Sequence, residues 1–553
     1  MTKQELANLL GIDEENIEAE SNKFKISDIA IKKIDAKLWL RDIEIEFWRC
    51  SFEKVLVFPQ RKSDKGLSIR AKILFQDCSF KGFLNARNSV FEKDFECINC
   101  DFEGKASFSG AEFIGRVNFS ISRFKNEARF IKTKFQAQAT TDEAIENDFG
   151  ETQFEGDALF ALNNFSGRTS FVMAKFLKDA LWFDITFNQV SFKKTIFEAS
   201  STWQNVTFKE KVEFKNVVFQ KSNFSEAKFI RDAEFDGVIF KDLTSFYKTH
   251  FYQKANFQGS IFGGITSFDQ TNFATKPDFL NCTFSNQFNI KHQYLQYEYD
   301  DIVNKVNKVN KVNKVNKVNK VNKVNKVNKV NKVKNPQIKD NPSLWRDLFR
   351  RLKSNRLAYH NLIDASELRV QELYAREIEL NEKQNKASFK EKIEKWQLWF
   401  YRHTSDHHTD LLKIFGWILA TIACFGVFLG MSRYGLDFGR FTGVYQLRIF
   451  SDIFSQVAMW FYTDLNHICA WFYNLFFLSL FFSFSRFIAS LSVVCLMIAI
   501  QPRYILGIGG FLSEKIQSQG IIENFLFVVY SLFMFLLFFS LQKTARKNSI
   551  VPN

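Results

Sequence analysis

The sequence predicts an all-β solenoid that is followed by a helical connector and an α-helical transmembrane domain. Three observations lead to this fold class. Phenylalanine recurs at intervals of five and six residues, a small or β-branched residue stands two positions before most of these phenylalanines, and long apolar segments fill much of residues 411–541. The chain has 553 residues, which is enough for several domains.

The phenylalanine spacing is compatible with neither a regular helix nor a flat strand. Between residues 224 and 284 the steps alternate strictly between five and six. Such steps rotate a helical side chain by about 140° and about 240°, so that no single apolar face forms. In a flat strand they would alternate between the two faces. A chain that turns a corner between short strands directs every phenylalanine to one axis, as in a solenoid. The predicted interior ladder contains Phe224, Phe229, Phe235, Phe240, Phe246, Phe251, Phe257, Phe262, Phe268 and Phe273, and it continues to Phe284.

The position two residues before each ladder phenylalanine is small or β-branched, as Ala233 and Thr249 illustrate. On an extended segment this position faces the same side as the phenylalanine. A large and a small side chain that share the interior fill a narrow coil without voids. We therefore expect both columns to be buried, with the polar residues between them on the outer surface.

The same ladder extends upstream from Phe80 to Phe135, stops, and resumes at Phe149. Trp182 and Trp203 replace phenylalanine at two positions. The interruption at 136–148 is acidic, and we expect a loop or short helix inserted at a corner of the solenoid. Independent β-hairpins are the alternative, but they would need Asn-Gly or Asp-Gly turns, and only Asp236-Gly237 fits.

This ladder resembles that of the pentapeptide-repeat protein family, in its variant with a central phenylalanine and alternating spacing. The resemblance implies a right-handed quadrilateral β-solenoid over residues 71–290. From the residues before it we expect an N-terminal cap at 1–70, made of a short helix and imperfect first coils. In that cap, Thr2 and Glu5 suit a helix capping box and Gly11 suits a helix end. Proteins with unrelated functions use this scaffold, so the resemblance implies a fold and leaves the function open.

Charge bears on the partners of the solenoid. The net charge of the chain is +15, but ten copies of Val-Asn-Lys from Val303 to Lys332 contribute ten lysines. Residues 71–290 contain 26 basic and 27 acidic side chains. Some members of the family that the ladder resembles inhibit DNA gyrase by imitating duplex DNA, which requires a strongly acidic surface. A nearly neutral solenoid argues against such imitation, and no nucleic-acid partner is expected.

The cysteines predict neither a disulfide framework nor a redox centre. Cys78, Cys100 and Cys282 occupy small inward positions, and Cys97 replaces a ladder phenylalanine. Cys97 and Cys100 form a Cys-x-x-Cys pair, which is also a zinc or redox pattern, but both positions are predicted to point into the solenoid. Buried thiols are the expected outcome.

Two segments join the solenoid to the apolar region. The low-complexity linker at 301–335 is either a solvated spacer or a polybasic tether to anionic lipid. Residues 343–410 form an amphipathic helical connector, which is either a helical hairpin or a helix that lies on a membrane surface. The connector ends in HTSDHHTD at 403–410, where His403 and His407 have a spacing that metal ligands also use. A polar junction before a membrane helix is the expected reading, and no metal is predicted.

The region 411–541 predicts a transmembrane domain with helices at about 411–431, 468–485, 487–506 and 521–541. No signal peptide precedes the N-terminal domain, and the tail at 542–553 is basic, so both ends are expected in the cytoplasm. Four crossings, divided near Arg486, satisfy this topology. A re-entrant segment, which gives three crossings, is the alternative. The expected location is the bacterial cytoplasmic (inner) membrane.

Gly507, Gly509 and Gly510 lie shortly before the last apolar segment. Their setting resembles the two-helix, potassium-channel-like module that some pentapeptide-repeat membrane proteins carry. The threonines that precede such a filter are absent, and Gly510 replaces its aspartate. The resemblance therefore implies a degenerate pore segment.

The sequence shows no phosphate-binding loop, no nucleophile elbow and no dense set of metal ligands, so neither enzyme activity nor a cofactor is expected. The predicted function is a membrane-anchored scaffold that presents the cytoplasmic solenoid to a protein partner. The alternative is a channel-like protein in which the solenoid regulates the pore segment. Expected partners are the lipid bilayer, an unidentified protein and, through the lysine-rich linker, anionic lipid; an oligomer is compatible with the sequence.

Overall fold

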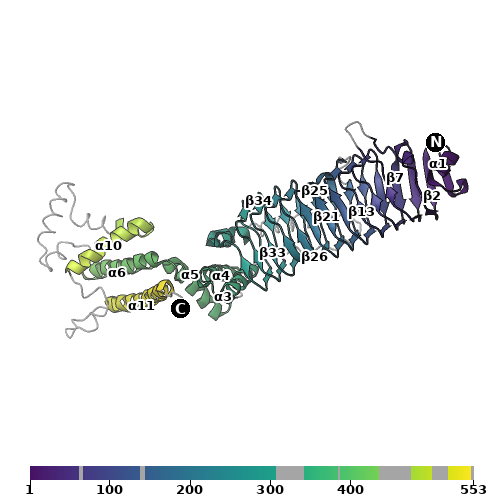
Figure 1. The fold of residues 1–553 in the computed structure, drawn as a ribbon. Helices are drawn as coiled ribbons and strands as arrows, with labels where there is room; N and C mark the ends of the chain where they lie inside the picture. The colour runs from purple at the N-terminus through teal and green to yellow at the C-terminus, as the bar shows by residue number, and fades with distance from the viewer. Residues whose placement is uncertain are drawn as a thin grey trace, which may run out of the picture. The chain divides into compact units, whose positions relative to one another are not determined.

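The computed structural model describes residues 1–61, 67–137, 144–306, 342–383, 387–434, 475–476, 478–500 and 521–549. The chain divides into two compact units, Met1–Ala375 and Arg376–Asn553. The first unit holds the repeats, and the second unit consists of helices (Figure 1).

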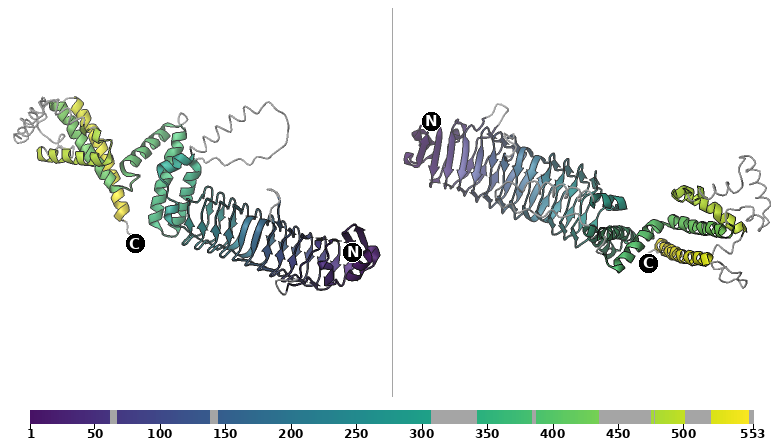
Figure 2. Two further views of the ribbon diagram at one scale, coloured as in Figure 1. Left: turned by 90° about the horizontal axis from the view of Figure 1, so that it is seen from above. Right: turned by 180° about the vertical axis from the view of Figure 1, so that it is seen from behind.

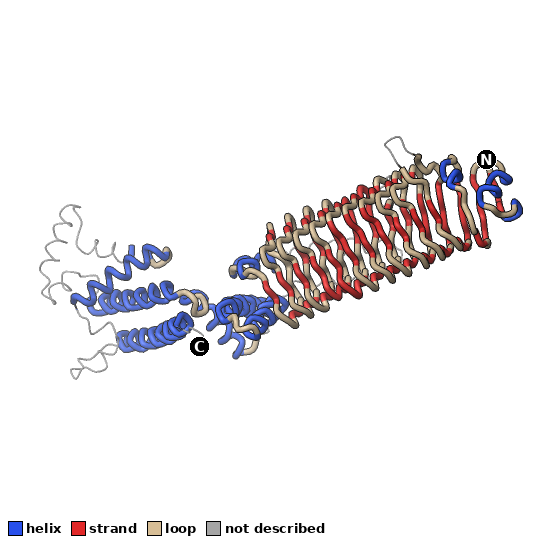
Figure 3. The backbone as a smooth tube through the Cα atoms, viewed as in Figure 1, coloured by secondary structure: helices blue, strands red, loops and turns tan. Residues whose placement is uncertain are grey.

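The first unit is a parallel β-solenoid of about 12 turns over residues 23–289, which confirms the predicted fold class. Successive turns lie one above another and each turn contributes short strands at its sides (Figures 1 and 3). Most strands pair with a strand 21 or 22 residues further along, as Phe102 with Phe124 and Phe176 with Phe197. These pairings arrange the strands in four rows, so the solenoid has four sides.

The first row comprises β2 (Lys23–Ser27), β4 (Glu44–Trp48), β7 (Lys72–Gln76), β11 (Phe95–Ile98), β15 (Val117–Asn118), β19 (Asn147–Asp148), β22 (Asn164–Ser170), β25 (Thr186–Ser191), β28 (Val212–Glu213), β31 (Ala233–Glu234) and β35 (Ala255–Asn256). The second row comprises β3 (Ala30–Ile31), β5 (Ser51–Phe52), β8 (Ser79–Phe80), β12 (Asp101–Phe102), β16 (Arg123–Phe124), β20 (Gln153–Phe154), β23 (Lys175–Phe176), β26 (Ile196–Thr202), β29 (Val218–Asn223), β32 (Ile239–Phe240), β36 (Ile261–Phe262) and β39 (Thr283–Phe284).

The third row comprises β6 (Leu56–Val57), β9 (Leu84–Asn85), β13 (Ala106–Ser107), β17 (Ala128–Ile131), β21 (Ala158–Ala161), β24 (Ala180–Phe183), β33 (Thr244–Ser245), β37 (Thr266–Ser267) and β40 (Phe288–Asn289). The fourth row comprises β10 (Val90–Phe91), β14 (Glu112–Phe113), β18 (Lys134–Phe135), β27 (Thr207–Phe208), β30 (Lys228–Phe229), β34 (His250–Phe251) and β38 (Asn272–Phe273). The longer strands β22, β25, β26 and β29 continue around a corner and take part in two rows.

The ladder aromatics form stacked columns inside the solenoid. All ten residues of the predicted ladder are buried, and none is more than 5% exposed. The rings of Phe246 and Phe268, one turn apart, lie 4.6 Å apart with planes only 1° from parallel. Rings from different columns meet edge to face, as Phe224 and Phe235 do at 5.9 Å and 90°. Both geometries suit the quadrupoles of aromatic rings, so the interior combines apolar burial with favourable ring contacts.

The corners explain the alternation of five and six. Every second corner of the solenoid is a tight turn, and the corner at residues 246–249 is an example. There Thr249 donates its amide to the Phe246 carbonyl at 3.1 Å, and Lys248 has a φ of 52°. A bond from residue i+3 to residue i with positive φ at i+2 defines a type II turn. Asn, Asp or Gly occupies many of these left-handed positions, including Asn99, Asp184 and Gly259. These turns take the five-residue steps, and the other corners take six residues in the regular part of the ladder.

The interruption at 136–148 falls between two ladder phenylalanines, Phe135 and Phe149. Val117 pairs with Asn147, thirty positions further on, so this turn contains more residues than its neighbours. The extra residues lie between β18 and β19. Residues 138–143 of this insertion lie outside the described part of the chain.

Most of the N-terminal end is covered by α1 (Lys3–Leu10), η1 (Glu14–Asn16), β1 (Ile17–Glu20) and η2 (Ala36–Leu40). Helix α1 has the capping box of Thr2 and Glu5, and Gly11 ends it with a φ of 62°. Strand β1 pairs antiparallel with β2, and η2 places Leu38 and Trp39 in the interior, fully buried. Parallel coils therefore begin at residue 23, within the segment 1–70 where the sequence predicts a short helix and the first coils.

After the last turn come η3 (His292–Tyr294), α3 (Pro342–Ala358) and α4 (Leu362–Lys383). The second unit contains α5 (Phe389–Ser405), α6 (Leu411–Tyr434), α10 (Ser483–Ile500) and α11 (Ile521–Ser549) (Figure 2). Because α3 lies in the first unit, the unit boundary at Ala375 divides the segment 343–410 that the sequence treats as one connector.

Hydroxyl and thiol side chains at the small inward position also form hydrogen bonds to main-chain carbonyls. The hydroxyl of Thr271 donates to the Phe246 carbonyl of the preceding turn at 2.6 Å. Thr249 and Ser260 donate in the same way, and the Cys282 thiol lies 2.9 Å from the Phe257 carbonyl. Such bonds tie each corner to the turn before it and satisfy buried carbonyl oxygens.

We expect Thr271→Val to lower the free energy of unfolding of the solenoid by about 1–2 kcal/mol, because the buried bond to the Phe246 carbonyl is lost while the volume is kept. Thr271→Ser retains the hydroxyl and is the control, expected to cost less. Thermal or urea unfolding followed by the β-sheet circular dichroism of the full chain measures both variants. Equal stability of the valine and serine variants would contradict the role assigned to the hydroxyl.

Candidate interaction surfaces and membrane-crossing helices

The outer surface of the solenoid carries charges that pair between neighbouring turns. Lys81 pairs with Glu53 at 2.8 Å and Lys193 pairs with Glu213 at 2.6 Å. Such exposed pairs contribute little to stability, typically below about 1 kcal/mol each. Their main effect is to balance the charge of neighbouring turns locally.

One outward column of β-branched aliphatic residues runs along the second row of strands. Each member precedes an inward-pointing phenylalanine, so its own side chain faces outward. This aliphatic column consists of Ile196, Val218, Ile239 and Ile261, paired in register on adjacent strands. Ile261 is 40% exposed. The column at the same place in the fourth row is polar, with Thr186, Thr207, Lys228, His250 and Asn272. The two faces of the solenoid therefore differ chemically at matched positions.

The last turn of the solenoid is covered by helix α3. Arg356 donates from Nη1 to the Phe288 carbonyl at 2.7 Å and from Nη2 to the Ile290 carbonyl at 3.1 Å. Arg351 donates to the Cys282 carbonyl and Asn355 donates to the Asn286 carbonyl, each at 2.7 Å. An open end of a β-solenoid exposes main-chain groups that would pair with another strand. These three side chains satisfy carbonyls at that end, so α3 acts as a cap.

The apolar side chains of α3 are buried and orient this helix against the end of the solenoid. Trp345, Phe349 and Leu352 of α3 are buried, and Trp345 meets the ring of Tyr297 edge to face at 5.0 Å. The apolar face of α3 that the sequence also allows on a membrane surface is thus occupied within the first unit. Arg356 itself is buried and pairs with Asp364 at 3.4 Å.

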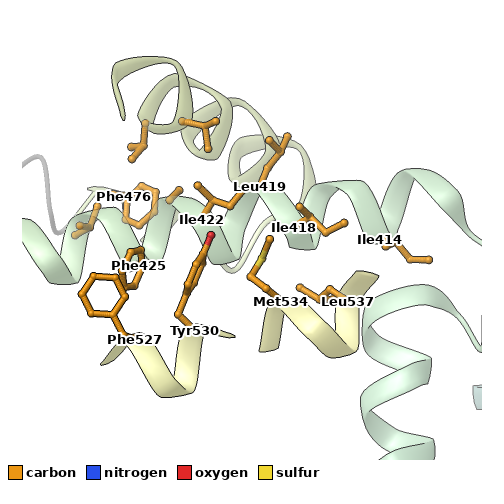
Figure 4. Close-up of a cluster of buried hydrophobic side chains, with 14 of the residues drawn as sticks. Ile414, Ile418, Leu419, Ile422, Phe425, Phe476, Phe527, Tyr530, Met534 and Leu537 are labelled. Atoms are coloured by element: carbon orange, nitrogen blue, oxygen red, sulfur yellow. The ribbon is translucent and has the colours of Figure 1, made fainter. Parts of the chain in front are cut away.

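In the second unit, α6 packs against both α10 and α11 (Figure 4). Ile414, Ile418, Ile422 and Phe425 of α6 meet Phe527, Tyr530, Met534 and Leu537 of α11 in a buried cluster. The rings of Phe425 and Tyr530 stack with centroids 4.2 Å apart. This contact fixes two of the most apolar helices side by side.

Among the residues that the structure describes, two helices are long and apolar enough to cross a membrane by length and composition, with spans at Leu411–Phe428 in α6 and Asn524–Ala545 in α11. The apolar stretch of α10, Ser485–Cys495, is shorter. Arg486 lies in the first turn of α10, with its guanidinium 4.5 Å from the centre of the Trp417 ring. The expected crossings at 468–485 and 487–506 lie partly outside the described residues.

The junction at 403–410 is a corner between α5 and α6. Asp406, His407 and His408 have positive φ values of 49°, 53° and 71°. The His408 ring lies 2.8 Å from the Ser540 hydroxyl of α11, and Trp417 donates its indole N–H to the His403 carbonyl. Within the described part of the chain, no group of three or more His, Cys, Asp or Glu side chains is placed to hold a metal ion.

The remaining predicted sites are placed as follows. Cys78, Cys97, Cys100 and Cys282 are buried free thiols. Burial raises the pKa of Cys97, Cys100 and Cys282, whereas the neighbouring Cys100 thiol, together with burial, raises the pKa of Cys78. The pore segment with Gly507, Gly509 and Gly510 lies outside the described residues, as does most of the 301–335 linker.

Sequence reasoning missed the arginine cap and the aliphatic column. The cap residues lie 66 to 69 positions from the carbonyls that they bind, and spacing gives no sign of such a contact. The column could have been found from its signal, a β-branched aliphatic residue directly before four ladder phenylalanines spaced 21 or 22 residues apart.

Comparison with known proteins identifies the repeats. The family model for pentapeptide repeats, described as nine copies, matches residues 98–145, 204–250 and 246–289. The matched segments lie within the solenoid, so the turns that they cover consist of pentapeptide repeats. No curated protein and no solved structure matches the chain.

We expect Arg356→Met to destabilise the last turn by about 2–3 kcal/mol, since it leaves the Phe288 and Ile290 carbonyls without a donor and retains most of the side-chain volume. Hydrogen exchange of the amides in residues 279–290 measures this opening. Arg350→Met is the control, because Arg350 is exposed and pairs only with Asp347 among the described residues. An exchange pattern that is the same in both variants would rule out the capping role.

His407 should make the helical unit sensitive to acid. Burial, with smaller contributions from His408, Arg402 and Lys413, lowers the pKa of His407 to about 3. An unfolded histidine has a pKa of about 6.5. The stabilisation by neutral His407 is therefore fully present above pH 6.5. It is lost as the pH falls from 6.5 towards 3, by up to about 1.4 kcal/mol per pH unit.

His407→Asn suits the left-handed backbone and does not titrate, so the unfolding free energy of the variant should fall less steeply between pH 6 and 4 than that of the wild type. The more accessible His403 provides the control His403→Gln, which should keep the wild-type slope. A wild-type slope in the His407 variant would show that this ring does not control the acid response.

Proposed function

We propose that the protein is a membrane-anchored scaffold, in which the pentapeptide-repeat solenoid presents its aliphatic column to a protein partner. The observation that carries this proposal is the chemical difference between the two faces at matched register. Four aliphatic residues run along one face where the other face carries threonine, lysine, histidine and asparagine.

The rigidity of the solenoid supports a binding role. A partner that binds a surface with fixed strand register loses little free energy to ordering that surface. The column offers apolar contacts on four adjacent turns, and the paired charges on other turns provide a polar surround. Enzyme activity, a cofactor and a nucleic-acid partner form no part of this proposal.

The helical unit supports the membrane anchor. In α11, Phe525, Leu532 and Phe535 are 67%, 60% and 69% exposed. A folded protein in water rarely exposes so large a contiguous apolar face, whereas lipid covers it without cost. Basic residues in the tail favour a cytoplasmic C-terminus, and we propose a bacterial inner-membrane protein whose solenoid is also cytoplasmic. The lysine-rich linker adds attraction to anionic lipid.

Photocrosslinking in living cells tests the scaffold. A photoreactive amino acid at position 239 in the full chain should give an adduct of one discrete mass that stays with the membrane after carbonate washing. The same amino acid at position 228, which occupies the matched place on the polar face, is the control. Val218→Glu with Ile261→Glu should abolish the adduct from position 239. Equal adducts from both positions, or none from position 239, would overturn the proposed surface.

Ion flux separates the scaffold from the channel alternative. Liposomes that contain the full chain should show no potassium or sodium flux. Flux that disappears in a Gly509→Trp variant would replace the scaffold by a channel that the solenoid regulates.

A further inference from the structure

The N-terminal end of the solenoid leaves one strand edge without a strand beside it. Strand β6 begins the third row and pairs with β9, and among the described strands it has no partner on its other side. Rows one and two continue to β2 and β3 at this end, but the chain after β3 turns into η2 instead of forming a strand beside β6.

The main chain of β6 directs hydrogen-bonding groups to this open side. Leu56 donates its amide to the Phe83 carbonyl at 3.0 Å, and Phe58 donates to the Asn85 carbonyl at 2.9 Å. Amide and carbonyl groups alternate in direction along a strand. The amide and carbonyl of Val57 therefore point away from β9, toward the side that lacks a strand. The side chain of Val57 is 45% exposed and that of Val55 is 56% exposed.

A groove of about 560 Å³ lies along this edge, between residues 31–40 and residues 52–60. Ile31, Phe52 and Leu56 contribute to its apolar lining. Four lysines surround that lining, and among the described residues no carboxylate side chain lines the groove: the lysines are Lys32, Lys33, Lys37 and Lys54. Each is exposed, and within the described part of the chain none of the four forms an ion pair, in contrast to Lys72 and Lys81 of the following turns.

We propose that this edge binds an extended acidic segment of a partner protein, which adds a strand beside β6. Main-chain bonds to Val57 would hold the segment, its apolar side chains would contact the groove lining, and its carboxylates would meet the four lysines. Strand addition to an exposed edge is a general mode of peptide recognition. The site lies apart from the aliphatic column, so it does not depend on the function proposed above.

The charge of the groove selects the occupant. A second copy of the chain would bring the same four lysines to the contact, and like charges at close range oppose pairing. An acidic strand is attracted by the four lysines, whereas a second copy of this edge is repelled by them. The C-terminal end of the solenoid differs, because there the chain covers its own last turn. The covering side chains are Arg351, Asn355 and Arg356 of α3. At β6 the described chain provides no such cover.

Peptide binding tests the site in the full chain held in detergent micelles. The probe is a fluorescent octapeptide of alternating glutamate and valine with blocked ends, and its partner probe replaces glutamate by lysine. The acidic peptide should bind, and the basic peptide should bind at least about tenfold more weakly. Lys33→Glu with Lys37→Glu should weaken binding of the acidic peptide about tenfold or more. The matched control, Lys209→Glu with Lys228→Glu, reverses Lys228 of β30 and Lys209, the residue after β27, and should leave binding unchanged.

Hydrogen exchange separates strand addition from simple charge attraction. The acidic peptide should slow exchange of the Val57 amide about tenfold or more, while the Leu56 amide, which already bonds to Phe83, should change little. Both the loss on charge reversal and the protection of Val57 support the proposal. Absence of binding, equal binding of the two peptides, or binding that leaves the Val57 amide unprotected would overturn it.

Discussion

The stacking of aromatic rings on successive turns is the interaction on which the solenoid depends. Strands that pair within a sheet lie about 4.7–4.9 Å apart, and parallel aromatic rings pack at nearly the same spacing. A phenylalanine one turn above another therefore keeps the ring contact and the main-chain bonds at once, as Phe246 and Phe268 do. A shift of one residue along a strand would turn the ring outward and lose the ring contact, even where main-chain bonds could re-form. The columns thus hold the register of every turn.

This constraint tolerates change at the corners more readily than in the interior. Trp182 and Trp203 stack at 4.7 Å inside the same columns, so a larger ring is accepted where two neighbours match. One turn gains residues between β18 and β19, and the bulges in β22 and β26 let neighbouring turns differ by one residue. At each such place the aromatic column continues, because the extra or missing residue is taken up where the chain bends.

A stack of identical turns leaves open ends, and the two ends are treated differently. At the C-terminal end, guanidinium and amide groups of α3 replace the donors that a further turn would have provided. At the N-terminal end, α1, β1 and η2 cover most of the first turn, while the edge of β6 keeps its main-chain groups beside a lysine-lined groove. The outer faces, in contrast, are free to vary, since neither stacking nor register constrains the side chains that point outward.

The sequence by itself determined the solenoid, the buried columns and the most apolar helices, because these follow from periodic spacing and local hydropathy. Spacing alone predicts the ladder from Phe224 to Phe273, and local hydropathy predicts the apolar segments at 411–431 and 521–541. Tertiary structure alone decided that Arg356 caps the last turn, that His407 is buried in a corner, and that Val57 lies on an open edge. Each of these depends on contacts between residues far apart in the chain, or on a strand that fails to form, and no local pattern encodes such relations. The division of the 343–410 connector has the same cause, since α3 joins the solenoid through bonds to carbonyls more than sixty residues away.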